Sequence, residues 1–192
     1  MNCELISVGT EILLGDILNS NVQFLSKELA LLGMNVMRHT TVGDNEKRLL
    51  KALDDAFEFS QAVILTGGLG PTPDDLTKET CCKYFGIGLQ EDSEILDKIE
   101  SYFKLKNIVM PECNKKQALV PTDGRVLPNR NGTAPGFILE KDGKVCGVKV
   151  TDANGTYTIN CTAVIVATGG FGANVEMRQK YNKHWPSLDE SI

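Results

Sequence analysis

Short apolar runs and longer amphipathic segments follow one another along the first 140 residues. The apolar runs have the length of buried strands, and the amphipathic segments carry apolar residues three and four positions apart, as helices do. The predicted strands cover residues 4–8, 35–42 and 62–65, and the predicted helices cover residues 21–32, 46–59 and 93–105. This alternation predicts an α/β fold with three layers, α/β/α, in which helices cover both faces of a mostly parallel sheet.

Each predicted strand ends in a polar or glycine-rich turn. The first turn is Gly9-Thr10-Glu11, the second is Gly43-Asp44-Asn45, and the third runs from Gly67 to Asp75. The carboxyl ends of parallel strands lie at one edge of the sheet, where α/β proteins bind their ligands. We therefore expect the carboxylates of these turns to face one cleft: Glu11, Asp44, Asp74 and Asp75.

The third turn carries the strongest chemical signal. It reads Gly67-Gly68-Leu69-Gly70-Pro71-Thr72-Pro73-Asp74-Asp75, and a helical pattern begins directly after it. Glycines allow the backbone to approach an anion closely, and the free N–H groups of the next helix point toward that anion. Asp74 and Asp75 add hard oxygen ligands that suit a divalent cation. The alternative is a tight turn in which Asp74 or Asp75 caps the helix.

Composition narrows the class of protein. The 192 residues are enough for one domain of about 150 residues and a remnant. A net charge of −5 argues against a nucleic-acid partner, because no strongly basic field is present. The six cysteines show no C-x-x-C spacing, which favours buried thiols in a reducing compartment. No export signal or membrane-spanning run occurs, so we expect a cytoplasmic protein that binds neither membrane nor nucleic acid.

Residues 1–140 carry six motifs, in order, that resemble one family. They lie at 8–17 (with Asn19 and Asn21), 42–45, 66–77, 110–112, 114–118 and 131–136. Together they resemble the amino-terminal domain of the competence/damage-inducible CinA family, which belongs to the molybdopterin-binding superfamily. The resemblance implies a homo-oligomer, a dimer or trimer. For CinA-like domains it implies ADP-ribose pyrophosphatase activity that depends on Mg²⁺, Mn²⁺ or Co²⁺, with K⁺ as a further option. For the wider superfamily it implies binding of molybdopterin or an adenylyl-pterin.

The resemblance also implies roles by position. Asp75 and Thr77 match the D-x-T of the superfamily's glycine loop, and Lys116 and Gln117 lie in its second polar loop. The implied catalytic residues are Asp75, Asp74 and Lys116, and the implied metal ligands are Asp75 and Asp44. The residues expected to bind a nucleotide or pterin substrate are Gly9, Thr10, Glu11, Asn21, Asp44, Gly67, Gly68, Gly70, Pro71, Thr72, Thr77, Gln117, Asn131, Gly132 and Thr133.

The pattern changes beyond residue 140. Val145–Val150 alternates, Asn154-Gly155 is a hairpin-turn signal, and Tyr157 and Ile159 fit the returning strand. A further apolar run, Ala163–Ala167, enters a second T-G-G-x-G turn. One interpretation is that Val164–Val166 completes the main sheet. We therefore divide the chain into a domain over 1–140 and a divergent tail over 141–192.

The tail resembles a fragment of a fumarate reductase-type flavoprotein, in which a late strand ends in Ala-Thr-Gly-Gly, here Ala167–Gly170. The G-x-G-x-x-G fingerprint that such proteins use for FAD is missing, so we expect no FAD and interpret the chain as a chimera. Three functions stay open: metal-dependent hydrolysis of a nucleoside diphosphate sugar, a non-catalytic module for molybdopterin or a nucleotide, and an inactive chimera.

Overall fold

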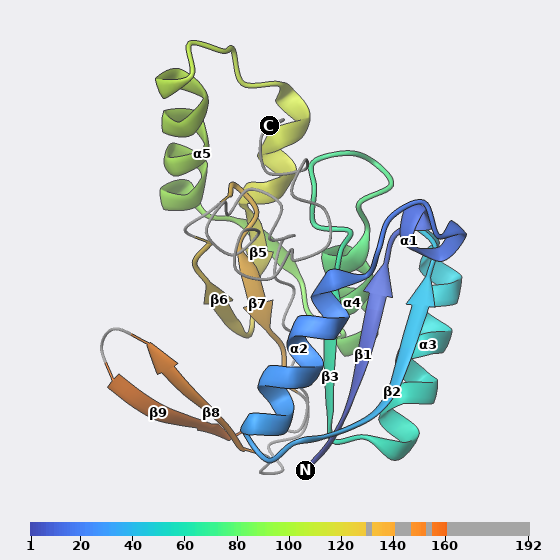
Figure 1. The fold of residues 1–192 in the computed structure, drawn as a ribbon. Coiled ribbons are helices and arrows are strands. Elements are labelled where there is room, and N and C mark those ends of the chain that lie inside the picture. The colour runs from blue at the N-terminus through green and yellow to red at the C-terminus, as the bar shows by residue number, and fades with distance from the viewer. Residues whose placement is uncertain (130–131, 141–146, 153–154, 161–192) are drawn as a thin grey trace, which may run out of the picture.

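The computed structural model describes residues 1–129, 132–140, 147–152 and 155–160 (Figure 1). Its first half contains β1 (Asn2–Val8), α1 (Thr10–Leu14), α2 (Ser20–Leu31), β2 (Asn35–Val42), α3 (Glu46–Phe59), β3 (Ala62–Thr66) and α4 (Thr77–Phe85). The second half contains β4 (Leu89–Glu91), α5 (Ser93–Leu105), the 3-10 helix η1 (Glu112–Ala118), β5 (Leu119–Pro121), β6 (Arg125–Leu127), β7 (Gly136–Ile138), β8 (Gly147–Asp152) and β9 (Gly155–Asn160).

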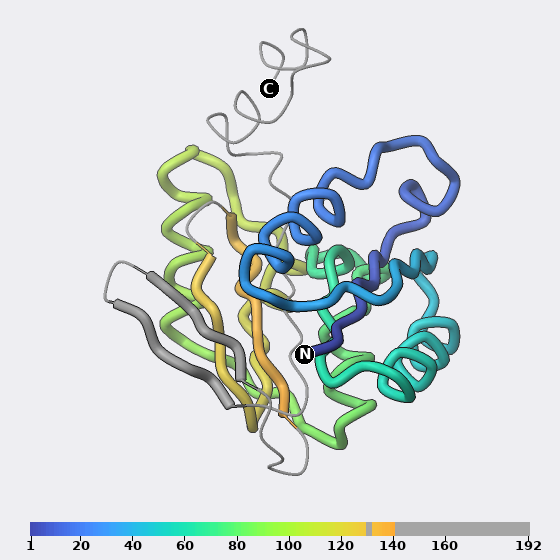
Figure 2. Tube along the Cα trace, turned by 60° about the horizontal axis from the view of Figure 1, so that its bottom comes forward, coloured from blue at the N-terminus to red at the C-terminus, as the bar shows by residue number. Residues whose placement is uncertain are grey.

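The centre of the fold is a parallel sheet in the order β2-β1-β3. Successive residues of β1 point to opposite faces, and both faces are covered. Leu5 packs with Val22 and Leu29 of α2 on one face, while Ile6 packs with Leu49 of α3 on the other. Figure 1 shows α2 in front of the sheet and α3 and α4 behind it, and Figure 2 separates the two helix layers. The predicted three-layer α/β/α fold is confirmed.

Local signals place the helices well. The predicted bounds of α3 and α5 match the structure, and α2 begins one residue earlier than predicted. The Asn19 side chain accepts a hydrogen bond from the Val22 N–H at 3.2 Å and thereby caps α2. Gly33 follows the end of α2 with φ +73°, a conformation that glycine adopts without strain.

The short strands of the second half form two antiparallel pairs, β4 with β5 and β6 with β7. These strands have three residues each, too few for an alternating pattern to be recognised, and the sequence did not predict them. Phe137 and Leu139 join the core between the parallel sheet, α3 and α4, so this half is attached to the first by apolar packing.

Beyond residue 140, β8 and β9 pair as an antiparallel hairpin with Gly147 opposite Asn160 and Asp152 opposite Gly155. The predicted strand at Ala163–Ala167 and the second T-G-G-x-G turn lie outside the described residues. The division at residue 140 and the addition of Val164–Val166 to the sheet stay predictions. In the described part of the chain, no helix has the length and apolar character needed to cross a membrane.

Candidate functional site

The three strand-end turns lie at one edge of the sheet. Val8 is in register with Val42, and Ser7 is in register with Thr66, so β1, β2 and β3 end side by side. The Gly9 N–H donates to the carbonyl of Val42 at 2.9 Å, which ties the first turn to the second strand. The prediction that these turns lie at one edge of the sheet is confirmed, whereas a single cleft shared by their four carboxylates stays a prediction.

The first and second turns are joined by Thr10 and Asp44. The Thr10 N–H and hydroxyl both donate to Asp44 Oδ2, at 2.9 and 2.8 Å, and the Asp44 N–H donates back to the Thr10 hydroxyl at 3.3 Å. Glu11 is exposed, and its carboxylate lies over Gly9, where an added Cβ would meet Oε1 at 2.7 Å. Two carboxylates therefore stand at this part of the edge, and one of them already binds a threonine.

The glycine loop, residues 67–75, has a backbone that only glycine fits at its start. Gly67 and Gly68 have φ values of +96° and +65°. A Cβ on Gly67 would lie 1.9 Å from the Val8 carbonyl oxygen, and one on Gly68 would lie 2.2 Å from the Thr77 hydroxyl. Thr77 is fully buried; its hydroxyl donates to the Gly67 carbonyl at 2.8 Å and its N–H to the Gly68 carbonyl at 3.0 Å. Thr77 thus fixes the start of the glycine loop from the buried side.

The Asp75 side chain stabilises the glycine loop through hydrogen bonds within the loop. Its Oδ2 accepts from the Thr72 N–H at 3.0 Å and from the Thr72 hydroxyl. A Cβ on Gly70 would lie 2.3 Å from the same oxygen, so Gly70 leaves room for this carboxylate. Helix α4 instead has Leu76 at its cap position, with no side-chain cap bond. The alternative in which Asp74 or Asp75 caps α4 is therefore wrong.

Asp74 stands on the solvent side of the same loop. The pKa of Asp74 is lowered, chiefly by a hydrogen bond from the Thr72 side chain. A hydrogen bond from the Asp74 backbone and the nearby Lys116 ammonium lower it further. The Thr72 hydroxyl also donates to Asp75, and because it has a single proton it can donate fully to only one of the two carboxylates at a time. Asp74 is therefore ionised at neutral pH and open to solvent.

The second polar loop, which includes η1, donates side-chain hydrogen bonds to the backbone of the glycine loop. The Lys116 ammonium donates to the carbonyls of Thr72, at 3.0 Å, and of Asp75. Gln117 donates to the Leu69 carbonyl at 3.4 Å, and its own oxygen accepts from the Thr133 hydroxyl at 2.9 Å. The structure thus brings Lys116, Gln117 and Thr133 to the loop as predicted residues, although Lys116 faces backbone carbonyls.

Two further residues at this junction were not predicted. Lys78 is 7% exposed, and its ammonium donates to the carbonyls of Lys116 and Leu119, each at 2.7 Å; burial lowers its pKa. Both carboxylate oxygens of Glu79 are buried without a hydrogen bond, and Oε1 lies 3.8 Å from the Lys116 ammonium. In the sequence both residues resemble solvated helix positions, so no local signal could identify them.

The remaining predicted residues are more scattered. Asn21 lies half-buried in the first turn of α2, and it is Asn19 that reaches β1, through a 2.7 Å hydrogen bond to the Ser7 hydroxyl. Pro71 is a half-buried part of the glycine loop, and Gly132 lies beside Asn129. Asn131 lies outside the described residues.

The predicted metal ligands, Asp44 and Asp75, do not form a ready set of donors for a cation. Asp44 and Asp75 belong to different turns, and each already accepts two hydrogen bonds from a threonine. Within the part of the chain that the structure describes, no three His, Cys, Asp or Glu side chains are grouped so that they could hold a metal ion. The described residues do not fit a metal held by the protein alone, and the proposed metal ligands stay predictions.

A parallel sheet with a glycine loop at its carboxyl edge is the arrangement of a ligand-binding α/β domain. The family model described as "Probable molybdopterin binding domain" matches residues 4–151, and the chain belongs to this family. The match extends past the boundary predicted at residue 140.

Relatives in the comparisons support the CinA resemblance. Two share the name "Putative competence-damage inducible protein": that of Caldicellulosiruptor saccharolyticus is 57% identical over 145 residues, and that of Clostridioides difficile is 56% identical over 144 residues. The alignments cover 76% and 75% of this chain but 35% and 34% of the relatives, so the chain spans about a third of their length. A crystal structure of the protein CinA with unknown function from Thermoplasma acidophilum has a TM-score of 0.67 and 28% identity, covering 95% of this chain and 96% of that one.

Proposed function

We propose that this domain binds the phosphate of a nucleotide or a pterin at the glycine loop, as a module without turnover. The observation that carries this proposal is that the loop is already built. Gly67 and Gly68 allow the loop backbone to lie close to β1. Hydrogen bonds donated by Thr77, Lys116 and Thr72 fix the conformation of the loop. A loop that is ordered before its ligand arrives loses little conformational entropy on binding.

Two positive features lie beside the glycine loop, although Asp74 and Asp75 carry negative charge in the same loop. Leu76 gives α4 no side-chain cap, so the positive end of the helix dipole lies next to the loop, where the Gly68 carbonyl already accepts from the Thr77 N–H. Lys116 adds a positive charge next to the loop, partly offset by the Glu79 carboxylate 3.8 Å away. These groups can offset a phosphate's charge without a basic surface elsewhere. Thr10, Glu11 and Asp44, at the same edge, would supply polar groups for a ribose or a pterin ring.

Binding is testable by calorimetry with ADP-ribose, AMP and inorganic pyrophosphate on wild type and two lysine variants. Lys116→Met removes the ammonium that holds the carbonyls of Thr72 and Asp75, and we expect it to weaken binding about tenfold or more. Lys115→Met is the matched control, since Lys115 forms a surface ion pair with Glu112 at 2.7 Å. Equal affinities of the two variants, or no binding to wild type, would contradict the proposal.

A second candidate is metal-dependent ADP-ribose hydrolysis. Its support is Asp74, an ionised and exposed carboxylate beside the loop, because Mg²⁺ is often held by one or two carboxylates together with substrate phosphates. Incubation with ADP-ribose and Mg²⁺, Mn²⁺ or Co²⁺ should then release AMP, and Asp74→Asn should slow that release. Binding without AMP favours the module, whereas neither binding nor AMP favours the inactive chimera.

We also propose that the chain is cytoplasmic and homo-oligomeric, a dimer or trimer. Large apolar side chains at several surface positions support an oligomer: Leu14 and Leu18 are 70% and 72% exposed, and Leu105 and Val109 are 84% and 90% exposed. Light scattering after gel filtration measures the mass directly, and a monomer at micromolar concentration would refute this expectation.

A further inference from the structure

Strand β2 has a free edge. It is the outer strand of the parallel sheet, and among the described residues it pairs with β1 alone. The Val42 carbonyl accepts from Gly9, so the backbone groups of Val42 face β1. Backbone groups of neighbouring residues in a strand point to opposite sides, so those of Thr41 face outward. Unpaired edges of this kind can accept another strand.

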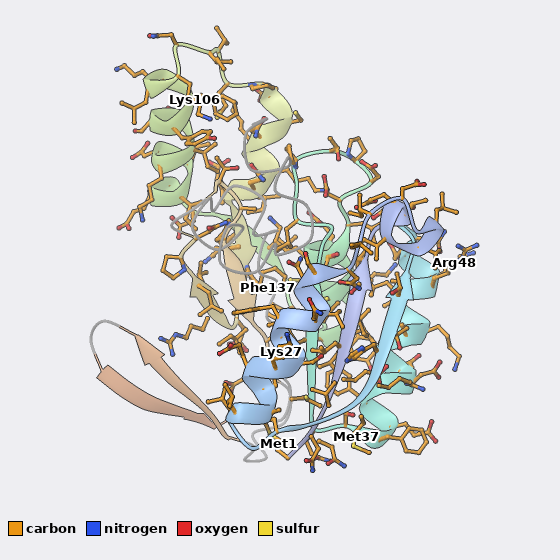
Figure 3. All side chains as sticks on the ribbon, in the orientation of Figure 1. Met1, Lys27, Met37, Arg48, Lys106 and Phe137 are labelled. Atoms are coloured by element: carbon orange, nitrogen blue, oxygen red, sulfur yellow. The ribbon has the colours of Figure 1, made fainter. Side chains whose placement is uncertain are left out.

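A groove follows this edge on the side of α3. It has a volume of about 590 Å³, and its strand wall extends from Arg38 to Gly43. At about 3.3 Å per residue, this wall is roughly 17 Å long. The helix wall carries Lys47, Arg48 and Lys51. Figure 3 shows Arg48 beside α1, at the end of α3 that lies nearest the strand-end turns.

Basic side chains outnumber acidic ones among the residues that line the groove, although the whole chain is acidic. Arg38 is paired with the buried Glu4 at 2.8 Å, and Lys51 with Asp55 at 2.5 Å. Lys47 and Arg48 have no ion-pair partner among the residues that the structure describes. Two uncompensated cations thus face a groove in a chain of net charge −5.

We propose that this groove docks an extended acidic segment of a partner protein, which adds to β2 as a further strand. Such a segment would pair with the outward backbone groups of β2, while its carboxylates meet Lys47 and Arg48. A single phosphate is far shorter than the groove. A nucleic-acid strand is disfavoured, because no aromatic side chain lines the groove to stack with bases. The proposal is independent of the function proposed for the glycine loop.

The test measures fluorescence anisotropy of a labelled peptide of alternating Glu and Val residues, about ten residues long, with the full chain. We expect binding at low salt that weakens in about 1 M salt, where the screening length falls to about 3 Å. The double variant Lys47→Glu/Arg48→Glu should lose about tenfold or more in affinity. The control Lys27→Glu/Lys104→Glu makes the same change in net charge at exposed positions on α2 and α5, and it should stay within about twofold of wild type.

A backbone variant separates strand addition from simple charge attraction. Thr41→Pro removes an outward N–H and leaves pairing with β1 intact, so it should lower peptide affinity although every charge is kept. Circular dichroism checks that each variant is folded. Wild-type affinity in a folded Thr41→Pro variant would overturn strand addition. An equal loss in the two double variants, no binding by wild type, or tighter binding of a single-stranded DNA of similar length would overturn the proposal as a whole.

Discussion

The contact between the glycine loop and strand β1 can be tested by adding one methyl group. Gly67→Ala places a Cβ 1.9 Å from the Val8 carbonyl oxygen, more than 1 Å inside the 3.0 Å limit that real Cβ contacts respect. The neighbour is backbone in the central strand, so it cannot rotate away. The matched control is Gly86→Ala at the end of α4, where φ is +70° and no atom lies within 4 Å of an added Cβ.

The two variants share one cost and differ in another. An alanine at positive φ costs about 1 kcal/mol at either position. At Gly67 the ends of β1 and β3 must also separate, which disrupts several hydrogen bonds worth about 1 kcal/mol each. We expect Gly67→Ala to lower the free energy of unfolding by about 4 kcal/mol and Gly86→Ala by about 1 kcal/mol. The larger loss is a substantial part of the roughly 5–15 kcal/mol that is typical of a domain.

Thermal unfolding followed by circular dichroism measures the difference. For a chain of this size, about 1 kcal/mol corresponds to a Tm change of roughly 3 °C, so the expected losses are about 12 °C and about 3 °C. Equal Tm values for the two variants would refute the reasoning, because they would show that β1 does not confine Gly67. Calorimetry with ADP-ribose adds a second measure: Gly67→Ala should abolish binding, and Gly86→Ala should retain it.

Three further predictions follow from the same geometry. Asp75→Asn keeps one acceptor for the loop, so ligand affinity should change by no more than about fivefold. If the wild type hydrolyses ADP-ribose with a metal, this variant should abolish that hydrolysis, and normal turnover would remove Asp75 from any metal site. Thr40→Val deletes a 2.8 Å hydrogen bond to the buried Glu4 carboxylate and should cost about 2 kcal/mol in urea unfolding, against little for Thr41→Val. Burial raises the pKa of Cys82 from 9.0 to about 11, which favours the folded state below pH 9.0; this stabilisation should disappear between pH 9.0 and about 11, and a flat stability profile there would refute it.

Much of the fold could be predicted because its signals are local. The bounds of α3 and α5 follow from apolar spacing within each segment and from caps such as Asn45, whose side chain accepts from the Arg48 N–H at 3.1 Å. The convergence of the three turns follows from a general property of parallel sheets. Helix α1 was predicted as part of a turn, because its five residues lie on an exposed surface and bury none of their side chains.

The candidate site was predicted in its residue types and not in its contacts. The glycine loop, Asp75, Lys116 and Gln117 were all identified, yet Lys116 binds carbonyls of a loop 41 and 44 residues earlier in the sequence. Spacing along the chain carries no information about which atoms such distant segments bring together. Lys78 and Glu79 were missed for the same reason, since Lys78 binds the carbonyls of residues 38 and 41 positions later, Lys116 and Leu119, and Glu79 lies beside the Lys116 ammonium.

The sequence by itself determined the long helices α2, α3 and α5, the parallel strands and the glycine-rich turn at their edge, because each depends on neighbours within a few residues. Only the tertiary structure decided which carboxylates of the site already accept hydrogen bonds from other residues of the protein. Asp75 and Asp44 each accept both a backbone and a side-chain hydrogen bond from a threonine, whereas Asp74 is exposed to solvent. The physical reason is that a carboxylate's partners depend on positions in space, which long-range packing fixes after the local elements have formed.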